Sequence, residues 1–390
     1  MTEDIVFLSA ARTAIGTFGG SLSGFAPGDL GAIVARAAIE RAGIAPDRIG
    51  TVVFGHVINT EPRDMYVSRV AALGAGVPDT VPAMNVNRLC GSGAQAIVSA
   101  AQALMTGDAD IALAGGAECM SRSPFILPAA RWGQKMGDVR ATDMMLGALN
   151  CPFGTGHMGV TAENVAAEMA ITRADQDAFA LESQHRAARA IAEDRFRDQI
   201  VPVEVPGRKG PTIFDTDEHP KETSAEALAG LKPAFQKDGT VTAGNASGIN
   251  DGAAALVMAR ASAAMGLKPR ARLIGWGLGG VAPRVMGYGP IPAVRSLCAR
   301  TGLRVEDFDV IESNEAFAAQ AIAVNRALGL DPHRVNPNGG AIALGHPVGA
   351  TGAILTVKAI AELERTGGRL ALVTMCIGGG QGIALAIERI

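Results

Sequence analysis

Asn87-Arg-Leu-Cys-Gly-Ser-Gly-Ala-Gln-Ala-Ile-Val98 opens a segment in which apolar residues recur every three or four positions. This period predicts a helix over residues 92–106. Residues 348–364 have apolar residues at the same spacing, each 256 positions later. The paired positions are Ala94 and Ala350, Ile97 and Ala353, Val98 and Ile354, Ala101 and Val357, Leu104 and Ile360, and Met105 and Ala361. We interpret the two segments as copies of one helix in an internally duplicated chain.

The duplication extends to the elements around these helices. In the first copy we expect strands at Ile5–Ser9, Thr51–Ile58, Ala83–Asn87 and Ile111–Ala114, and helices at 28–42, 63–73 and 92–106. In the second copy we expect strands at Arg272–Trp276, Val310–Glu312, Val335–Asn336 and Leu370–Met375, and helices at 292–300, 316–328 and 348–364. This alternation predicts an α/β fold with a largely parallel sheet and helices on its faces.

The domain organisation follows from where each copy ends. The second copy closes with a strand after Gly379, whereas a comparable strand in the first copy comes only after Gly248. We therefore expect residues 1–120 plus 249–269 to form one half and residues 270–390 the other. Residues 121–248, which contain irregular segments rich in proline and charge, are predicted to be an inserted loop domain.

Composition excludes several classes of protein. The 390 residues are 48% hydrophobic and 19% charged, which is typical of a globular chain rather than a disordered one. The net charge of −3 predicts no nucleic-acid or membrane surface. Apolar runs are too short to span a bilayer and the start is acidic, so we expect a cytoplasmic protein. The five cysteines include no C-x-x-C pair, so neither disulfides nor a metal site are expected.

Cys90 is the first candidate for chemistry. Glycines follow it and a helix begins there, so amide groups and the helix dipole would stabilise a thiolate. Packing is the alternative role. The same stretch contains Gly91-x-Gly93-x-x-Ala96 with Asp110 further on, which matches a short dinucleotide-binding pattern. An NAD-dependent dehydrogenase therefore remains a rival hypothesis at this point.

Three further residues have unusual surroundings. His346 occupies the position equivalent to Cys90, before Pro347 in the first turn of the duplicated helix and after a glycine-rich loop. Cys376 precedes Ile-Gly-Gly-Gly, where backbone amides can be exposed to a ligand, although a buried packing thiol is equally consistent. Asn314 follows a strand, and it can either hydrogen-bond a water or carbonyl or cap a helix.

Taken together, these motifs resemble the thiolase family. They occur in order along the whole chain as Asn87-Arg-Leu-Cys-Gly-Ser-Gly, Gly156-His-Met-Gly, Gly244-Asn-Ala-Ser-Gly, Asn314-Glu-Ala-Phe, Gly345-His-Pro and Cys376-Ile-Gly-Gly-Gly. Glu61-Pro-Arg-Asp-Met-Tyr and Arg131-Trp-Gly are similar to bacterial β-ketothiolases that supply polyester precursors. Cys119 departs from the serine that the family commonly has there. The resemblance implies duplicated βαβαβαββ halves layered α/β/α/β/α, with an inserted loop domain.

The resemblance also implies a reaction and the residues that perform it. Two acyl-CoA molecules would condense to a 3-oxoacyl-CoA and CoA through an acyl group on Cys90, with thiolysis as the reverse. His346 would take the thiol proton, Asn314 would hold a water, and Cys376 would be the base for the second substrate. The amides of Cys90 and Gly378 would bind the oxyanion. No cofactor or metal is implied, because CoA thioesters are themselves the substrates.

The resemblance also implies which residues contact the substrate and how the chains assemble. Lys221, and in the same basic surface Arg208 and Lys209, would face the CoA phosphates. His157 and Ser247 would lie along the pantetheine arm, with Met158 and Phe317 at the acyl end. The family is commonly a homotetramer built from dimers. A non-catalytic acyl-binding relative should lack a reactive residue, and none is missing; a ketosynthase usually has a second histidine or asparagine where Cys376 stands.

Overall fold

The computed structural model describes residues 3–390. Met1 and Thr2, at the start of the predicted first half, lie outside the described residues. Apart from the two-residue strand β2, the first half follows the order βαβαβαββ. Its elements are β1 (Ile5–Arg12), β2 (Gly16–Thr17), α1 (Pro27–Ala42), β3 (Thr51–Gly55), α2 (Val67–Gly74), β4 (Ala83–Val86), α3 (Ser92–Thr106), β5 (Ile111–Cys119) and β12 (Asn250–Arg260).

Helix α3 has the bounds that its apolar period predicts. The side chains of its predicted apolar face are buried, apart from Met105, which is 40% exposed. Met105 lies in the last turn of the helix, one residue before it ends at Thr106.

The second half repeats this order, except that the strand expected at Val335–Asn336 is reduced to a single bridge. Its elements are β13 (Ala271–Gly280), α8 (Pro290–Thr301), β14 (Val310–Ser313), α9 (Ala318–Leu328), α10 (Ala341–Leu344), α11 (Thr351–Thr366), β15 (Leu370–Ile377) and β16 (Gln381–Arg389). The predicted strand at Val335–Asn336 is a single parallel bridge between Ile311 and Val335. Asn336 turns the chain away because its φ is +44° and its side chain bonds Ser313 in both directions.

The strand order supports the duplication. From the middle outward, one half runs β1-β12-β5-β3-β4 and the other runs β13-β16-β15-β14, followed by the bridge at Val335. Strands β1 and β13 pair antiparallel through Ile5 and Leu273, Val6 and Arg272, and Phe7 and Ala271. This pairing joins the two halves into one ten-stranded sheet.

The prediction of a largely parallel sheet is wrong. Only β3 with β4, β3 with β5, and β14 with β15 pair in parallel, and the remaining strand pairs of the main sheet are antiparallel. The tight turn of three residues after β15 can only return the chain antiparallel, because a parallel pair needs a crossover connection. The residues between β5 and β12 likewise return the chain beside β5 in the opposite direction.

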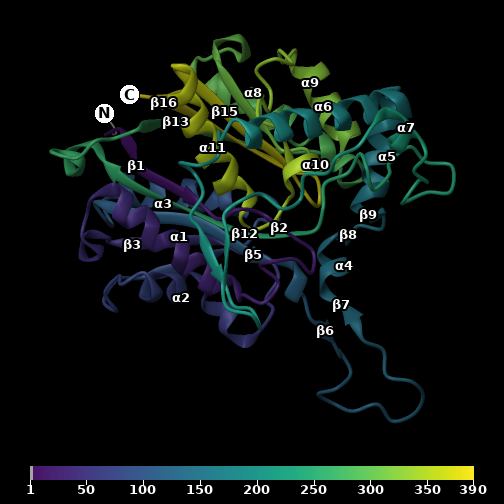
Figure 1. Ribbon diagram of the computed structural model, residues 1–390, viewed down its shortest axis with the longest axis horizontal. Helices are drawn as coiled ribbons and strands as arrows, with labels where there is room; N and C mark the ends of the chain where they lie inside the picture. Colours follow the sequence, from purple (N-terminus) through teal and green to yellow (C-terminus); the bar gives the residue numbers. More distant parts are fainter. Residues whose placement is uncertain (1–2) are drawn as a thin grey trace.

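The layers are helix, sheet, helix, sheet, helix, as predicted (Figure 1). Helices α1 and α2 cover the outer face of the first half, and α8 covers the outer face of the second. Helices α3 and α11 pack against each other between the halves, and each contacts strands from both. The duplicated helices therefore form the central layer.

The contact between α3 and α11 leaves no room for side chains at its closest points. A Cβ atom on Gly93 would lie 2.7 Å from the backbone nitrogen of Ala353. A Cβ on Gly352 would collide with the backbone nitrogen of Ala94. Glycine at both positions therefore lets the two backbones approach, which brings the N-terminal ends of both helices to one place.

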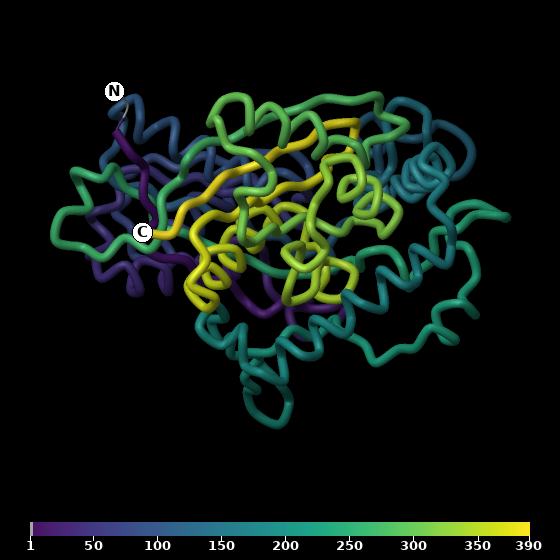
Figure 2. Tube along the Cα trace, turned by 90° about the horizontal axis from the view of Figure 1, so that it is seen from above, coloured from purple at the N-terminus to yellow at the C-terminus, as the bar shows by residue number. Residues whose placement is uncertain are grey.

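Residues between β5 and β12 form further elements on the outside of both halves (Figure 2). They are β6 (Phe125–Ile126), β7 (Thr142–Asp143), α4 (Met144–Ala148), β8 (Asn150–Cys151), β9 (Gly156–His157), α5 (Met158–Glu168), α6 (Arg173–Ala192), β10 (Val203–Val205), β11 (Thr212–Phe214) and α7 (Ala225–Ala229). Helices α5 and α6 contact α9 and α10 of the second half, whereas Ile200 and Asp217 contact Arg12 of the first half. The segment linking β6 to β7 extends away from the body (Figure 1). The division into 1–120 plus 249–269, 121–248 and 270–390 stays a prediction. Among residues 3–390, no helix is long and apolar enough to cross a membrane.

Candidate active site

Cys90 lies in the turn between β4 and α3, and side chains of the same turn hold it in place. Leu89 has a left-handed φ of +47°, which is strained for a residue with a side chain. The Leu89 amide donates to Asn87 Oδ1 at 3.0 Å, and Ser92 Oγ donates to the Leu89 carbonyl at 2.6 Å. In the second half Gly345, just before His346, also has a positive φ, of +105°. Both loops therefore turn sharply just before the candidate residue.

The Cys90 thiol is half-buried, and desolvation raises its pKa. The backbone amides of Gly378 and of Cys90 itself oppose this rise, while the nearby Glu118 carboxyl adds to it. The expected stabilisation of a thiolate by the start of α3 does not prevail, because burial is the larger effect. A thiol in this environment needs a neighbouring base to become a nucleophile.

His346 is buried, and its hydrogen bonds fix which nitrogen carries the proton. The Thr351 hydroxyl donates its one proton to the Pro347 carbonyl at 2.9 Å, and its oxygen lies 2.7 Å from His346 Nδ1. The hydroxyl must therefore accept from Nδ1–H, which leaves Nε2 without a proton. Burial lowers the pKa of His346 to about 4, so the imidazole is neutral near pH 7. Neutral Nε2 is a proton acceptor.

The backbone around His346 differs from the prediction in one respect. Helix α11 begins at Thr351, so Pro347 lies in a preceding turn rather than in the first helical turn. The His346 amide donates to Asn250 Oδ1 at 2.9 Å, and this side chain fills the space beside Gly345, where a Cβ would lie 2.5 Å from Asn250 Cγ. The His346 backbone is thus held by β12, and its imidazole is held by α11.

Asn314 follows β14 and lies beside His346, with its Nδ2 3.4 Å from His346 Nε2. The alternative role as a helix cap is wrong, because α9 begins four residues later and has no side-chain cap. Asn314 Oδ1 is buried without a hydrogen-bond partner in the part of the chain that the structure describes. An amide in this state can hold a small polar molecule.

Cys376 lies near the end of β15 in an apolar cluster that includes Met158, Met286 and Phe317. Burial raises the pKa of the Cys376 thiol, and the neighbouring Cys90 raises it further. The turn at residues 378–380 follows directly, and a Cβ on Gly378 would lie 3.1 Å from the Met158 methyl group. The two candidate cysteines therefore belong to different halves but to one site.

One cavity of about 380 Å³ contains most of the predicted site. Nine of the ten predicted residues line it, and they are Cys90, His346, Cys376, Gly378, His157, Met158, Lys221, Ser247 and Phe317. Asn314 lies behind the wall, against His346. Arg208 and Lys209 are exposed outside the lining, in the connection between β10 and β11. The structure thus brings the motifs together but leaves this basic pair apart.

Several lining residues were missed by the sequence reasoning. The Phe235 ring stacks on His157, with ring centroids 4.6 Å apart, and meets Phe317 edge-on at 6.1 Å. Met286 and His219 also line the cavity. Phe235 lies in an irregular stretch without periodicity, so no signal in the single sequence identifies it. His219 has the weak signal of proximity to Lys221, and burial lowers its pKa to about 4.

The glycines of the dinucleotide pattern have another use. A Cβ on Gly91 would collide with the Ile377 side chain, and Gly93 faces the α11 backbone. These glycines therefore permit contacts within the protein. The approach of a pyrophosphate, which the pattern requires, would need that same space.

Comparison with known proteins agrees with this arrangement. The family model "Thiolase, N-terminal domain" matches residues 5–262, and "Thiolase, C-terminal domain" matches residues 267–389. Beta-ketothiolase BktB of Cupriavidus necator is 61% identical, with 100% of each chain covered.

Two solved structures are also similar. The Bacillus anthracis acetyl-CoA acetyltransferase has a TM-score of 0.97 and 45% identity, covering 100% of this chain and 99% of its own. Human mitochondrial 3-ketoacyl-CoA thiolase in complex with CoA has a TM-score of 0.97 and 40% identity, covering 100% and 98%. The predicted fold and family are confirmed, and the chain belongs to the thiolase family of acyltransferases.

Proposed function

We propose that this thiolase condenses two short acyl-CoA thioesters, acetyl-CoA above all, to a 3-oxoacyl-CoA and free CoA, and catalyses the reverse thiolysis. The observation that carries the proposal is that Cys90, His346 and Cys376 line a single cavity. A relative 61% identical over its full length is a β-ketothiolase, and a similar structure is an acetyl-CoA acetyltransferase.

In the first half-reaction the Cys90 sulfur attacks the thioester carbonyl. His346 Nε2, neutral and unprotonated, takes the thiol proton and returns it to the sulfur of departing CoA. The bond from carbon to the CoA sulfur breaks as the bond to Cys90 forms. The amides of Cys90 and Gly378 hold the oxyanion, where the loss of one donor typically costs about 3–4 kcal/mol.

In the second half-reaction His346 Nε2 takes the proton of the Cys376 thiol, and the Cys376 thiolate then removes an α-proton from the second acyl-CoA. Burial disfavours the Cys376 thiolate, so that thiolate is a strong base once formed. The resulting enolate oxygen accepts hydrogen bonds from protonated His346 and from a water held by Asn314. The α-carbon attacks the carbonyl carbon of the acyl group, the bond from that carbon to the Cys90 sulfur breaks, and the sulfur takes the proton back from His346.

The residues between β5 and β12 contribute contacts to CoA in this proposal. Lys221 is exposed at the cavity, where it meets the phosphates, while Ser247 and His157 contact the pantetheine arm. Met158 and Phe317, both buried in the apolar cluster around Cys376, contact the acyl group. The human relative solved in complex with CoA supports a CoA site in this fold.

Assembly and location complete the proposal. The segment between β6 and β7 carries Trp132 and Met136, which are 89% and 84% exposed, and Phe125 beside it is 67% exposed. Apolar side chains gathered on one protruding segment are typical of a surface that another chain covers. This surface supports contact with another copy of the chain, as in the homotetramer built from dimers that the family resemblance implies. We expect this assembly to lie in the cytoplasm.

Mass spectrometry after treatment with acetyl-CoA tests the proposed function. We expect one acetyl group on the peptide that contains Cys90, together with release of free CoA. Cys90→Ser should remove both the label and nearly all turnover, because a hydroxyl is a much poorer nucleophile than a thiolate. A label of equal yield on another cysteine, or no label in the wild-type enzyme, would contradict the proposal.

A further inference from the structure

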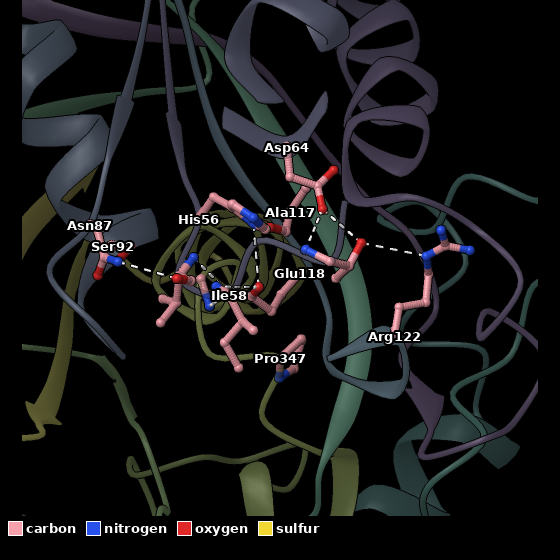
Figure 3. Close-up of polar contacts among 12 residues, drawn as sticks. His56, Ile58, Asp64, Asn87, Ser92, Ala117, Glu118, Arg122 and Pro347 are labelled. Atoms are coloured by element: carbon pink, nitrogen blue, oxygen red, sulfur yellow. Dashed lines mark hydrogen bonds and ion pairs between the residues drawn. The ribbon is translucent and has the colours of Figure 1, made fainter. Parts of the chain in front are cut away.

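Glu118 is a fully buried carboxylate at the end of β5, behind Cys90. Its Oε2 accepts hydrogen bonds from the amides of Val57 at 3.0 Å and Gly349 at 2.9 Å, and its Oε1 accepts from Ile58 at 3.1 Å. His56 Nδ1 lies 3.3 Å from Oε1 (Figure 3). The four groups come from the loop after β3 and from the turn before α11.

These bonds join the loop of the nucleophile to the loop of the base. Asn87 Nδ2 donates to the Val57 carbonyl at 3.3 Å, and Asn87 Oδ1 holds the turn before Cys90. Gly349 lies three residues after His346. A continuous path of hydrogen bonds therefore leads from Asn87 through Val57 and Glu118 to the His346 turn (Figure 3).

The same path places part of the cavity wall. Val57, Met120 and Val348 all line the cavity. The Val57 amide donates to Glu118, Met120 follows Glu118 by two residues, and Val348 precedes Gly349, whose amide also donates to Glu118. Space around the carboxylate is minimal, because a Cβ on Gly349 would collide with Glu118 Oε2. A change in the position of Glu118 would thus move three wall segments at once.

Hydrogen-bond chemistry indicates the ionised form of Glu118. Three partners are backbone amides, which only donate, and His56 Nδ1 carries a proton because it also lies 2.9 Å from the Ala117 carbonyl. Burial raises the pKa of Glu118, and the amides together with His56 oppose this rise. Three titratable groups face Cys90: Glu118, which raises the pKa of its thiol, Cys376, whose own pKa Cys90 raises, and His346, which lines the same cavity. His56 is paired with Glu118.

We propose that Glu118 is a positioning residue that holds the His346 loop against the Cys90 loop, so that base and nucleophile from the two halves meet in reacting geometry. Because the step it serves is the attack by Cys90, this inference rests on the proposed function. Glu118 is not among the residues that line the cavity. Its contribution is alignment, where a shift of about 1 Å can cost about 10²-fold in rate.

Glu118→Gln tests the proposal because it keeps the size but places an amide donor against backbone amide donors. We expect kcat to fall about 10²-fold while KM for acetyl-CoA stays within about twofold. Removal of the negative charge should also move the pH profile of Cys90 alkylation by iodoacetamide to lower pH. A loss of packing alone would not move that profile toward greater thiol reactivity.

Glu312→Gln is the matched control. Glu312 is another fully buried carboxylate, paired with Lys358 at 2.7 Å, and its contacts do not include the Cys90 loop. It should lose thermal stability without a shift in the Cys90 alkylation profile. If Glu118→Gln does not fold, Gly349→Ala displaces the same carboxylate from the other loop and should lower kcat in the same way.

The outcomes separate this inference from the function. Wild-type kcat in Glu118→Gln or in Gly349→Ala, or a lower kcat with an unchanged alkylation profile in Glu118→Gln, would overturn the positioning role. Iodoacetamide alkylation needs no acyl-CoA, so its pH dependence reports the ionisation of Cys90 even if the proposed reaction is wrong. Failure of the function appears instead as wild-type enzyme that takes up no acetyl group.

Discussion

Cys90 and His346 occupy the same place in two halves with one topology, and burial favours the neutral form of each, but only Cys90 has neighbouring groups that oppose this effect. Cys90 is half-buried in a strained turn, next to two backbone amides that favour its charged form. His346 is buried between side chains, and this burial favours its neutral form. Duplication therefore supplies two helix ends that face each other, and divergence of a few residues makes one a nucleophile and the other a base.

Outside the Cys90 turn, Cys376→Ala is expected to give the largest effect, because it removes the proposed base of the second half-reaction. Acetyl transfer to Cys90 should continue, since the Cys90 turn and His346 are untouched. Condensation should fall by about 10²–10⁴-fold, the usual value of a positioned base. Acyl-enzyme yield by mass spectrometry and exchange of the acetyl-CoA methyl protons with deuterated water by NMR should be measured on the same variant. Retained exchange would assign the base role to His346.

Thr351→Val tests the tautomer that makes His346 a base. Without the hydroxyl, Nδ1–H loses its acceptor and Nε2 is no longer kept free of the proton, so kcat should fall by about 10²-fold. Thr351→Ser keeps the hydroxyl and should retain most activity, as steady-state kinetics on both variants would show. Equal losses in the two variants would contradict this role, because Thr351→Ser keeps the hydroxyl that accepts from Nδ1–H.

The burial of His346 also predicts how stability depends on pH. Its pKa is about 4 in the folded chain and 6.5 as the ordinary value, so between these pH values the unfolded state binds the extra proton. This contribution is complete above about pH 6.5 and is lost as the pH falls to about 4, by about 3 kcal/mol. Urea unfolding from pH 4 to 7 of wild type and His346→Gln should show a shallower loss in the variant. Parallel curves would contradict the assigned pKa.

Lys221→Ala should have the smallest effect, because Lys221 is exposed and belongs to neither duplicated half. KM for acetyl-CoA should rise about two- to fivefold with kcat unchanged, and KM should become less sensitive to salt. Lys209→Ala, an exposed lysine outside the cavity lining, is the control and should behave as wild type. An equal rise in KM for a pantetheine thioester without phosphates would remove Lys221 from phosphate binding.

Much of the fold could be predicted because its signals are local or repeated. Helix α3 shows its bounds in its apolar period, and the repeat at 256 positions relates Cys90 to His346. The joining of the halves through β1 and β13 could not be predicted, since that pairing links residues far apart in sequence with no pattern of their own. The antiparallel direction of β12 was missed for the same reason.

The candidate site shows the same division. Motif residues such as Cys376 and Gly378 could be named because glycine runs mark them, and their roles stay predictions. Phe235 and Thr351 were missed, since what matters is the ring or hydroxyl each places against a histidine, and that placement depends on the tertiary structure. The raised pKa of Cys90 likewise depends on how deeply the finished fold buries the thiol.

The direct contact between the backbones of α3 and α11 limits which halves from different proteins can be combined. At Gly93 and at Gly352, backbone atoms of the other helix occupy the space that a side chain would need. Chimeric enzymes that take one half from this chain and one from a distant relative will therefore assemble only where both glycines are retained. A library of recombined halves should therefore be checked for glycine at positions 93 and 352 before any residue of the cavity is varied.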